Sequence, residues 1–351
     1  MRTLQQVKNE LKDYQGEKIA IMEVCGTHTS SIFKNGIRSF ISPQIQLISG
    51  PGCPVCVTSA TYIDKIIDYS LQENHCVLTF GDMLKVKGNN LSLTEAKAIG
   101  GSVRMLYSPL AALKIAKENK HIQFVFAAVG FETTAPIYAL LLEEIIKSKI
   151  KNLKLLTAIK TIIPAITYIC DNEKSIDAFL CPGHVSVITG SSVYNDLAKK
   201  YHKPFVIGGF EGEHILAAVY EIFQQVLSKQ YSAKNMYVSV VSEDGNQKAN
   251  AIIDKYFKHT DDYWRGIGVI KKSALRLKEE YLDFDAGSYF DEYLENSPIN
   301  CRCKDVILGR INPTDCPLFK RTCTPLSAIG PCMVSTEGVC GIWYKNREVQ
   351  Q

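Results

Sequence analysis

Residues 45–56 read IQLISGPGCPVC, a short apolar run that ends in glycines, prolines and two cysteines. The run IQLIS has the length and composition of a buried strand, and the helical pattern TYIDKIIDYSLQ follows at 61–72. A buried strand that leads through a loop into a helix is typical of a parallel sheet. The stretch therefore predicts an α/β fold. Its CxxC pair, Cys53 and Cys56, can be a redox disulfide, half of a zinc site, or a ligand pair for another metal.

Short apolar runs alternate with helical patterns along most of the chain. We expect two α/β units, 1–120 and 121–260, each with a parallel sheet covered by helices. The expected helices, besides 61–72, are 109–120, 135–149 and 213–229. The expected strands are KIAIMEV (18–24), IQLIS (45–49), CVLTF (76–80), IQFVFAAV (122–129), LKLLTAI (153–159), VSVIT (185–189), PFVIGGF (204–210) and MYVSVV (236–241).

The pattern changes beyond residue 260. Residues 261–287 contain a helical stretch without strand alternation, and from residue 297 the chain is rich in Cys, Pro and Gly. Such a segment buries too little apolar surface to fold alone, so we expect a bound metal to stabilise its fold. We therefore expect a third, smaller cysteine-rich module at 261–351.

The unusual motifs follow directly on predicted strands. They are EVCGTHT (23–29), GPGCPVC (50–56), GFETT (130–134) and GFEGEH (209–214), whereas CPGHVS (181–186) is expected to run into a strand. Ligands of open parallel sheets bind at the carboxyl ends of the strands. We expect the EVCGTHT and GPGCPVC loops to lie side by side at one such edge, facing the second unit across a cleft.

Composition and motifs argue against several classes of function. The net charge of +4 arises from 40 basic and 36 acidic residues spread along the chain, without the basic block that nucleic acid requires. No apolar run approaches the roughly 20 residues that span a bilayer, and the polar N-terminus lacks the apolar core of a signal peptide. Neither phosphate-binding pattern, GxxxxGK[ST] or GxGxxG, occurs. We expect a soluble cytoplasmic protein that binds neither nucleic acid, nucleotide nor membrane.

Twelve cysteines are the main anomaly of the composition. In a reducing compartment such a number indicates metal or redox chemistry rather than structural disulfides. Their distribution is uneven: three lie early, three are scattered, and six crowd the last 51 residues, namely Cys301, Cys303, Cys316, Cys323, Cys332 and Cys340. The early and late groups are therefore separate candidate sites.

The late group has the spacing Cys303-x12-Cys316-x6-Cys323-x16-Cys340, which leaves Cys301 and Cys332 over. Four thiolates can hold zinc or a [4Fe–4S] cluster. Zinc ribbons usually supply two close CxxC pairs, which are absent here, and uneven spacing suits a cube reached from separate loops. The spacing favours the cluster, with zinc as the alternative.

The early group consists of Cys25, His28, Cys53 and Cys56. A helix after the CxxC pair lowers the pKa of the first thiol through its positive end. The simpler interpretations are a lone structural zinc on Cys53 and Cys56, a packed Cys25, and a His28 that caps a helix. The joint occurrence of all four residues beside glycine-rich loops favours a chemically active site over these structural interpretations. His184 is as readily structural as functional, and the repeated GFE around Glu132 and Glu211 indicates two equivalent loops.

The motifs CGTHT, GPGCPVC, GFETTAP, PGHVS, YWRGIG, DCPLF and CMVSTEG, in this order across nearly the whole chain, closely resemble those of the HypD family of [NiFe]-hydrogenase maturation factors. The resemblance implies two α/β domains flanking a cleft and a third domain with a [4Fe–4S] cluster. It also implies the function of a scaffold on which the Fe(CN)2CO group is assembled with the chaperone HypC, using cyanide delivered by HypE.

The same resemblance implies roles for individual residues. Cys25, Cys53 and Cys56 are the family's essential thiols of the cleft, associated with iron or with a redox-active pair, and His28 belongs to the same motif. The ligand set implied for the cluster is Cys303, Cys316, Cys323 and Cys340. On this basis we expect the cluster to serve Cys53 and Cys56 with electrons while Cys25 anchors iron together with a cysteine of HypC.

The chain departs from the family pattern at Ser59, Gly212 and Ser239, where proline, proline and arginine are usual. These positions concern helix starts and partner contacts, and they remove no thiol. Two alternatives remain open at this point. One is a cluster-containing thiol–disulfide oxidoreductase that acts on protein disulfides, and the other is a zinc-bound interaction platform without redox activity.

Overall fold

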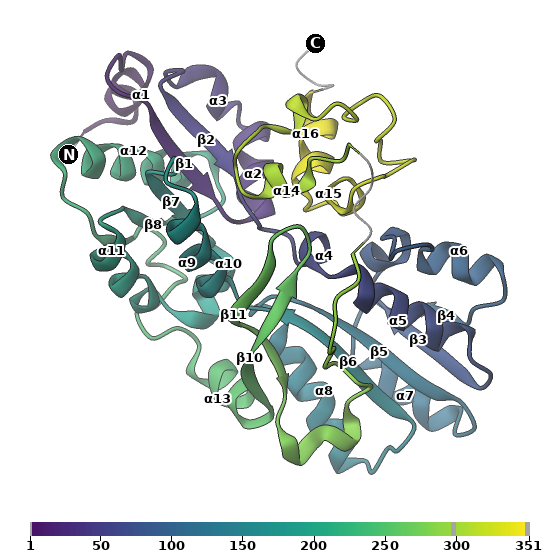
Figure 1. The fold of residues 1–351 in the computed structure, drawn as a ribbon. Helices are drawn as coiled ribbons and strands as arrows, with labels where there is room; N and C mark the ends of the chain where they lie inside the picture. Colours follow the sequence, from purple (N-terminus) through teal and green to yellow (C-terminus); the bar gives the residue numbers. More distant parts are fainter. Residues whose placement is uncertain (1, 296–299, 348–351) are drawn as a thin grey trace. The chain divides into compact units, whose positions relative to one another are not determined.

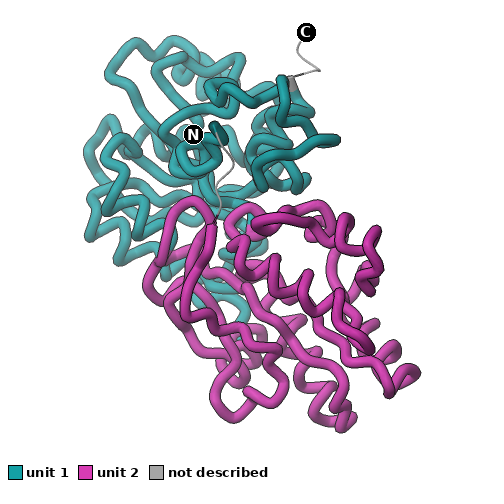
Figure 2. The backbone as a smooth tube through the Cα atoms, turned by 45° about the vertical axis from the view of Figure 1, so that its right-hand side comes forward, with its two compact units in different colours: residues 1–53, 165–247, 300–351 teal, residues 54–164, 248–299 magenta. Residues whose placement is uncertain are grey.

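The computed structural model describes residues 2–295 and 300–347, and the chain folds into two compact units (Figures 1 and 2). Unit 1 comprises residues 1–53, 165–247 and 300–351, and unit 2 comprises residues 54–164 and 248–299. This division differs from the three consecutive segments 1–120, 121–260 and 261–351 that the sequence predicts. The chain crosses between the units because parallel strands accept partners distant in sequence, and the apolar pattern does not encode that order.

Unit 1 contains a five-stranded, all-parallel sheet with the order β2-β1-β7-β8-β9. Its core is formed by apolar side chains of the strands, such as Ile21, Leu47 and Leu180, packed against helices within residues 4–40 and 212–228. The strands are β1 (Ile19–Glu23), β2 (Ile45–Ser49), β7 (Ala178–Cys181), β8 (Phe205–Ile207) and β9 (Ala233–Asn235).

Helices of unit 1 cover this sheet, and some helices of the unit lie in the cysteine-rich tail. The ring of Trp343 in α16 packs edge-on against Phe33 in α2 at 5.0 Å, and the tail lies within unit 1. The helices are α1 (Leu4–Lys12), α2 (Gly26–Lys34), α3 (Ile37–Phe40), α9 (Ile162–Asn172, which starts in the last residues of unit 2), α10 (Gly183–Thr189), η2 (Ser192–Tyr194), α11 (Asn195–Tyr201), α12 (Gly212–Ser228), α14 (Cys303–Ile307), η4 (Pro313–Asp315), α15 (Pro331–Val334) and α16 (Val339–Arg347).

Unit 2 contains a six-stranded sheet with the order β10-β11-β6-β5-β3-β4. The neighbouring strands among β3, β4, β5 and β6 pair in parallel. Strands β10 and β11 add an antiparallel hairpin to β6. The strands are β3 (His75–Thr79), β4 (Val103–Met105), β5 (Gln123–Gly130), β6 (Leu153–Lys160), β10 (Phe257–Trp264) and β11 (Gly268–Leu277). The helices are α4 (Pro54–Val57), α5 (Ala60–Leu71), η1 (Gly81–Lys85), α6 (Leu93–Ala98), α7 (Ala111–Glu118), α8 (Ala135–Lys147), α13 (Gln247–Tyr256) and η3 (Glu279–Phe284).

Two predicted strands are absent. VSVIT at 185–189 lies in helix α10, where the Ser186 hydroxyl donates to the Pro182 carbonyl at 2.8 Å and Gly190, with φ of 86°, ends the helix. The local start and stop signals thus override the β-propensity of the run. CPGHVS consequently follows strand β7, like the other motifs. MYVSVV at 236–241 forms a turn after β9, because the Asn235 side chain donates to the Val241 carbonyl at 2.8 Å.

The stretch expected to lack strand alternation forms the β10–β11 hairpin. The pattern is hidden in the sequence because charged residues occupy buried positions: Asp262 in β10 pairs with Lys160 at 2.6 Å and with Arg276 at 2.9 Å. Gly266 and Gly268, with φ of 77° and 116°, supply the left-handed conformations of the turn. Sequence patterns treat Lys, Asp and Arg as surface residues, and here one carboxylate pairs with both cations inside the unit.

Candidate metal and thiol site

The CGTHT and GPGC loops lie side by side in unit 1, as predicted. Strands β1 and β2 pair in parallel from Ile19↔Ile45 to Glu23↔Ser49, so both end at the same edge of the sheet. The Gly50 N–H donates to the Glu23 carbonyl at 2.7 Å. The loops approach so closely that a Cβ on Gly52 would lie 2.6 Å from the Cα of Cys25. Only glycine fits here, and it brings the Cys53 segment against the Cys25 backbone.

Replacing Gly52 by alanine is expected to destabilise the fold by about 1–3 kcal/mol, because the added methyl group meets backbone instead of a movable side chain. The measurement is the free energy of unfolding in urea. Gly81→Ala is the matched control, since the nearest atom there is the flexible Met105 sulfur at 3.2 Å. Equal effects of the two substitutions would contradict the close approach of the loops.

Below the loops lies a carboxyl group that the sequence analysis missed. Glu23 is buried at the end of β1, and it accepts hydrogen bonds from Thr29 Oγ1 and Ser49 Oγ, both at 2.6 Å. Burial raises its pKa to about 7 against the effect of these bonds and of Arg38. Glu23 thereby ties β1, β2 and α2 together under Cys25. Its only signal in the sequence is an acidic residue that ends an apolar strand.

Cys25 is the N-cap residue of α2 and is partly exposed. Desolvation of the sulfur by the surrounding protein raises the pKa of the Cys25 thiol to about 11, while hydrogen bonds from the backbone N–H groups of His28 and Thr27 lower it. The free thiol is therefore protonated at neutral pH, and a metal ion that binds there has to displace the proton. Cys53 and Cys56 are both buried, and neither is in a disulfide.

His28 is fully buried and its tautomer is defined by its partners. Nε2 lies 3.2 Å from both the Gly208 and Gly209 carbonyls, so Nε2 carries the proton. Nδ1 has no hydrogen-bond partner among the described residues, and burial lowers the pKa of the ring to about 4. The neutral imidazole therefore presents an unused lone pair at Nδ1.

Three motifs meet around one aromatic ring in unit 1. Phe210 of GFEGEH packs against His28 of CGTHT at 4.7 Å and stacks on His184 of CPGHVS at 4.0 Å. His184 is thus a packing partner of this cluster. GFETT lies in unit 2, where Glu132 is buried, whereas Glu211 is exposed at the start of α12. The two GFE loops are therefore unequal in environment.

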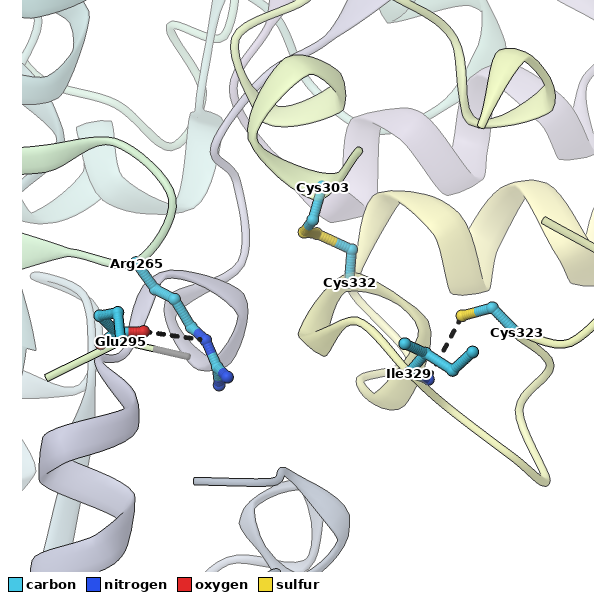
Figure 3. The surroundings of a disulfide bond; sticks show 6 residues. All are labelled: Arg265, Glu295, Cys303, Cys323, Ile329 and Cys332. Atoms are coloured by element: carbon cyan, nitrogen blue, oxygen red, sulfur yellow. Dashed lines mark hydrogen bonds and ion pairs between the residues drawn. A yellow bond between two sulfur atoms is a disulfide. The ribbon is translucent and has the colours of Figure 1, made fainter. Parts of the chain in front are cut away.

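The cysteine-rich tail lines one small cavity in unit 1. Cys303 is joined by a disulfide to Cys332 (Figure 3), and both line this cavity together with Cys301, Cys316, Cys323 and Cys340, which are not in a disulfide. Burial is the main cause that raises the pKa of Cys340, and the neighbouring thiols of Cys323, Cys301 and Cys316 raise it further. All six tail cysteines line this cavity, Cys303 and Cys332 as a disulfide, and the ligand set derived from the spacing stays a prediction.

Within residues 2–295 and 300–347, no three His, Cys, Asp or Glu side chains converge closely enough to hold one metal ion. The thiolates of a [4Fe–4S] cluster bind different iron corners and so lie further apart than the ligands of one ion. The Ile329 N–H lies 3.4 Å from the Cys323 sulfur, a hydrogen bond of the kind that tunes such clusters (Figure 3).

Among the described residues, no helix has both the length and the apolar character needed to cross a bilayer.

Comparison with known proteins identifies relatives along the whole chain. The family model "HypD: Hydrogenase formation hypA family" matches residues 1–347. A putative hydrogenase expression/formation protein of Methanocaldococcus jannaschii is 41% identical over 95% of this chain and 93% of its own length. The hydrogenase maturation factors HypD of Escherichia coli and Cupriavidus necator are 39% and 37% identical, over 95% and 94% of this chain and 91% and 90% of their own lengths. The resemblance of the motifs is confirmed, and the chain belongs to the HypD family of hydrogenase maturation factors.

Proposed function

We propose that this chain is the scaffold on which the Fe(CN)2CO group of a [NiFe]-hydrogenase is assembled, with HypC as the partner chaperone and HypE as the cyanide donor. The observation that carries the proposal is the close approach of the Cys25 and GPGC loops at one sheet edge. Family membership supplies the link to hydrogenase maturation. The scaffold has ligand-transfer and redox activity without turnover of a small metabolite.

Cys25 is assigned as the protein's anchor for the iron, which it holds together with a cysteine of HypC. Iron that carries cyanide and carbon monoxide is low-spin and soft, and thiolates suit it as donors. The partly exposed position of Cys25 leaves room for a ligand from a partner. His28 contributes the neutral imidazole beside it, whose Nδ1 accepts a hydrogen bond from a protonated ligand.

Cys53 and Cys56 are assigned to the electron balance of cyanide transfer. Cyanide bound to a thiol, R–S–CN, is released by two electrons as CN⁻ and the thiolate R–S⁻. When two thiols become a disulfide they give up these two electrons and two protons, so that the products are R–SH, HCN and the Cys53–Cys56 disulfide. The proton of HCN leaves when carbon binds iron.

A [4Fe–4S] cluster on Cys301, Cys316, Cys323 and Cys340 would supply electrons one at a time for the return of this disulfide to two thiols. The protein's own part is to hold four thiols around an apolar cavity, with the Ile329 N–H directed at the sulfur of Cys323. The donor chemistry of this cavity supports the assignment.

The test is to coproduce the chain with HypC and HypE and to purify the HypC complex anaerobically. We expect infrared bands of iron-bound cyanide and carbon monoxide, and brown absorption from the cluster. A colourless preparation would support the zinc platform. Reduction of insulin disulfides without HypC, in a preparation that lacks the infrared bands, would support the free-standing thiol–disulfide oxidoreductase and overturn the scaffold.

A further inference from the structure

Glu132 in unit 2 is a buried carboxyl group with half of its hydrogen-bonding capacity unused. It is 6% exposed, and its Oε1 accepts the Ile162 N–H at 2.7 Å. Its Oε2 is buried and has no hydrogen-bond partner among the described residues. Buried acceptors without a partner are rare in folded proteins and need an explanation. A carboxyl group in this position is suited to exchange a proton with a neighbour.

The neighbourhood of Glu132 includes the helix that carries Cys56. Glu132 follows the carboxyl end of β5, and α4, the short helix of Cys56, packs against β5. The Val57 carbonyl, next to Cys56, accepts the Arg265 N–H at 2.8 Å. The ring of Trp264, next to Arg265, packs against Phe131 at 6.0 Å. Two independent contacts within unit 2 thus bring the Cys56 and Glu132 segments to the same sheet edge.

The other charged groups at this edge are already matched. Lys160 pairs with Asp262, which also binds Arg276, and all three are buried. Glu295 accepts the Ala60 N–H at 2.6 Å and pairs with Arg265 at 3.4 Å (Figure 3). Burial raises the pKa of Glu132 to about 7, opposed only by backbone N–H groups, and burial lowers the pKa of Lys160 to about 8. Among the described residues at this sheet edge, Glu132 is therefore the carboxyl group that lacks a cationic partner.

We propose that Glu132 is the acid–base residue of the Cys53–Cys56 pair, giving a proton to Cys56 when the disulfide opens and taking it back when the disulfide closes. The inference rests on the proposed dithiol role of this pair. In the opening direction the thiolate of a dithiol reductant attacks the Cys53 sulfur. The S–S bond breaks, two electrons pass to the pair, and Cys56 leaves as a thiolate that takes the Glu132 proton.

The second thiol of the reductant then attacks the mixed disulfide and releases Cys53, so that the reductant ends as a disulfide and the protein as a dithiol. Glu132 regains its proton from water. In closing, the Cys53 thiol attacks the sulfur of R–S–CN, which breaks the S–CN bond, releases HCN and leaves a mixed disulfide at Cys53. The Glu132 carboxylate then removes the proton of Cys56, whose thiolate attacks this mixed disulfide and expels R–S⁻. A buried thiol needs such a local proton acceptor because water has little access to it.

The experiment uses the full-length protein purified anaerobically. The Cys53–Cys56 disulfide is formed with diamide and then reduced with dithiothreitol between pH 5.5 and 9. Reduced thiols are trapped by alkylation, and the peptide that contains Cys53 and Cys56 is quantified by mass spectrometry. The rate constant is expressed per dithiothreitol thiolate, which removes the ionisation of the reductant from the profile.

For the unmodified protein we expect a high rate constant below pH 7 that falls as Glu132 ionises. For Glu132→Gln we expect a flat profile, lowered roughly tenfold or more below pH 7. Glu295→Gln, at a partly buried carboxyl group with partners on both oxygens, is the control and is expected to keep the inflection. Far-UV circular dichroism and the melting temperature show whether the variants are folded, and Glu132→Asp, which keeps the carboxyl group, serves as a second variant that should retain a pH-dependent profile.

An unchanged inflection in folded Glu132→Gln overturns the inference. Failure of Cys53 and Cys56 to form a disulfide at all overturns both the inference and the proposed dithiol role. Loss of the inflection in Glu132→Gln supports the inference even if iron-bound cyanide is never found, because the assay needs neither HypC nor iron. The two proposals therefore fail separately.

Discussion

Replacement of Cys25 by alanine is expected to abolish the infrared bands of iron-bound cyanide and carbon monoxide in the HypC complex. Cys25 is the cysteine that the fold places at the N-cap of α2, beside the Gly52 loop and above the buried Glu23. Alanine keeps this backbone position and removes the soft donor that holds the iron. The expected loss is complete, to below the detection limit of the spectrum.

The matched control is Cys76→Ala, which removes a buried thiol from strand β3 of unit 2. It is expected to keep the bands, since Cys76 follows no motif and has only structural contacts here. Copurification of HypC with each variant is measured by mass spectrometry on the same samples. Wild-type band intensity in the Cys25→Ala complex would eliminate the anchoring role.

Replacement of Cys301 by alanine is expected to remove most of the visible absorption of the cluster, whereas Cys303→Ala keeps it. Cys301 lines the cavity without a disulfide, while the sulfur of Cys303, which lines the same cavity, is bonded to Cys332. A cluster that loses one of four thiolate ligands is destabilised or lost. The measurement is the iron content and the absorption spectrum of anaerobically purified protein.

The two variants control each other, because the changed residues are two positions apart in the same tail. Loss of iron in Cys303→Ala with full iron in Cys301→Ala would favour the set derived from spacing. Equal retention of iron in both variants would contradict a four-thiolate site in this cavity.

The sequence identifies the strands best where they are apolar throughout. IAIME, IQLIS and QFVFAAVG are buried strands of parallel sheets, as their composition indicates. The sequence does not identify strands in which charged residues are buried, as in the β10–β11 hairpin with its buried Asp262 and Arg276. It also fails at VSVIT, where helix signals on either side decide the conformation. Local composition reports propensity, and packing decides between propensities.

The candidate site was predictable in part for a similar reason. Cys25, His28, Cys53 and Cys56 are visible in the sequence because cysteine and histidine beside glycine are unusual residue types in unusual positions. Glu23 and Glu132 are ordinary residue types, and their burial, which raises their pKa values to about 7, exists only in the folded chain. Burial of a charge has no local sequence signature.

By itself the sequence determined the α/β class, the family, the cysteine-bearing motifs and the adjacency of the first two motif loops, since all of these follow from short stretches of chain. The tertiary structure alone decided which strands share a sheet, that the six cysteines of the tail line one cavity, and which carboxyl groups are buried. The physical reason is that pairing and burial depend on contacts between residues far apart in the chain, such as Cys301 with Cys340 and β1 with β7. Residue spacing measures distance along the backbone, whereas ligation and proton transfer depend on distance through space.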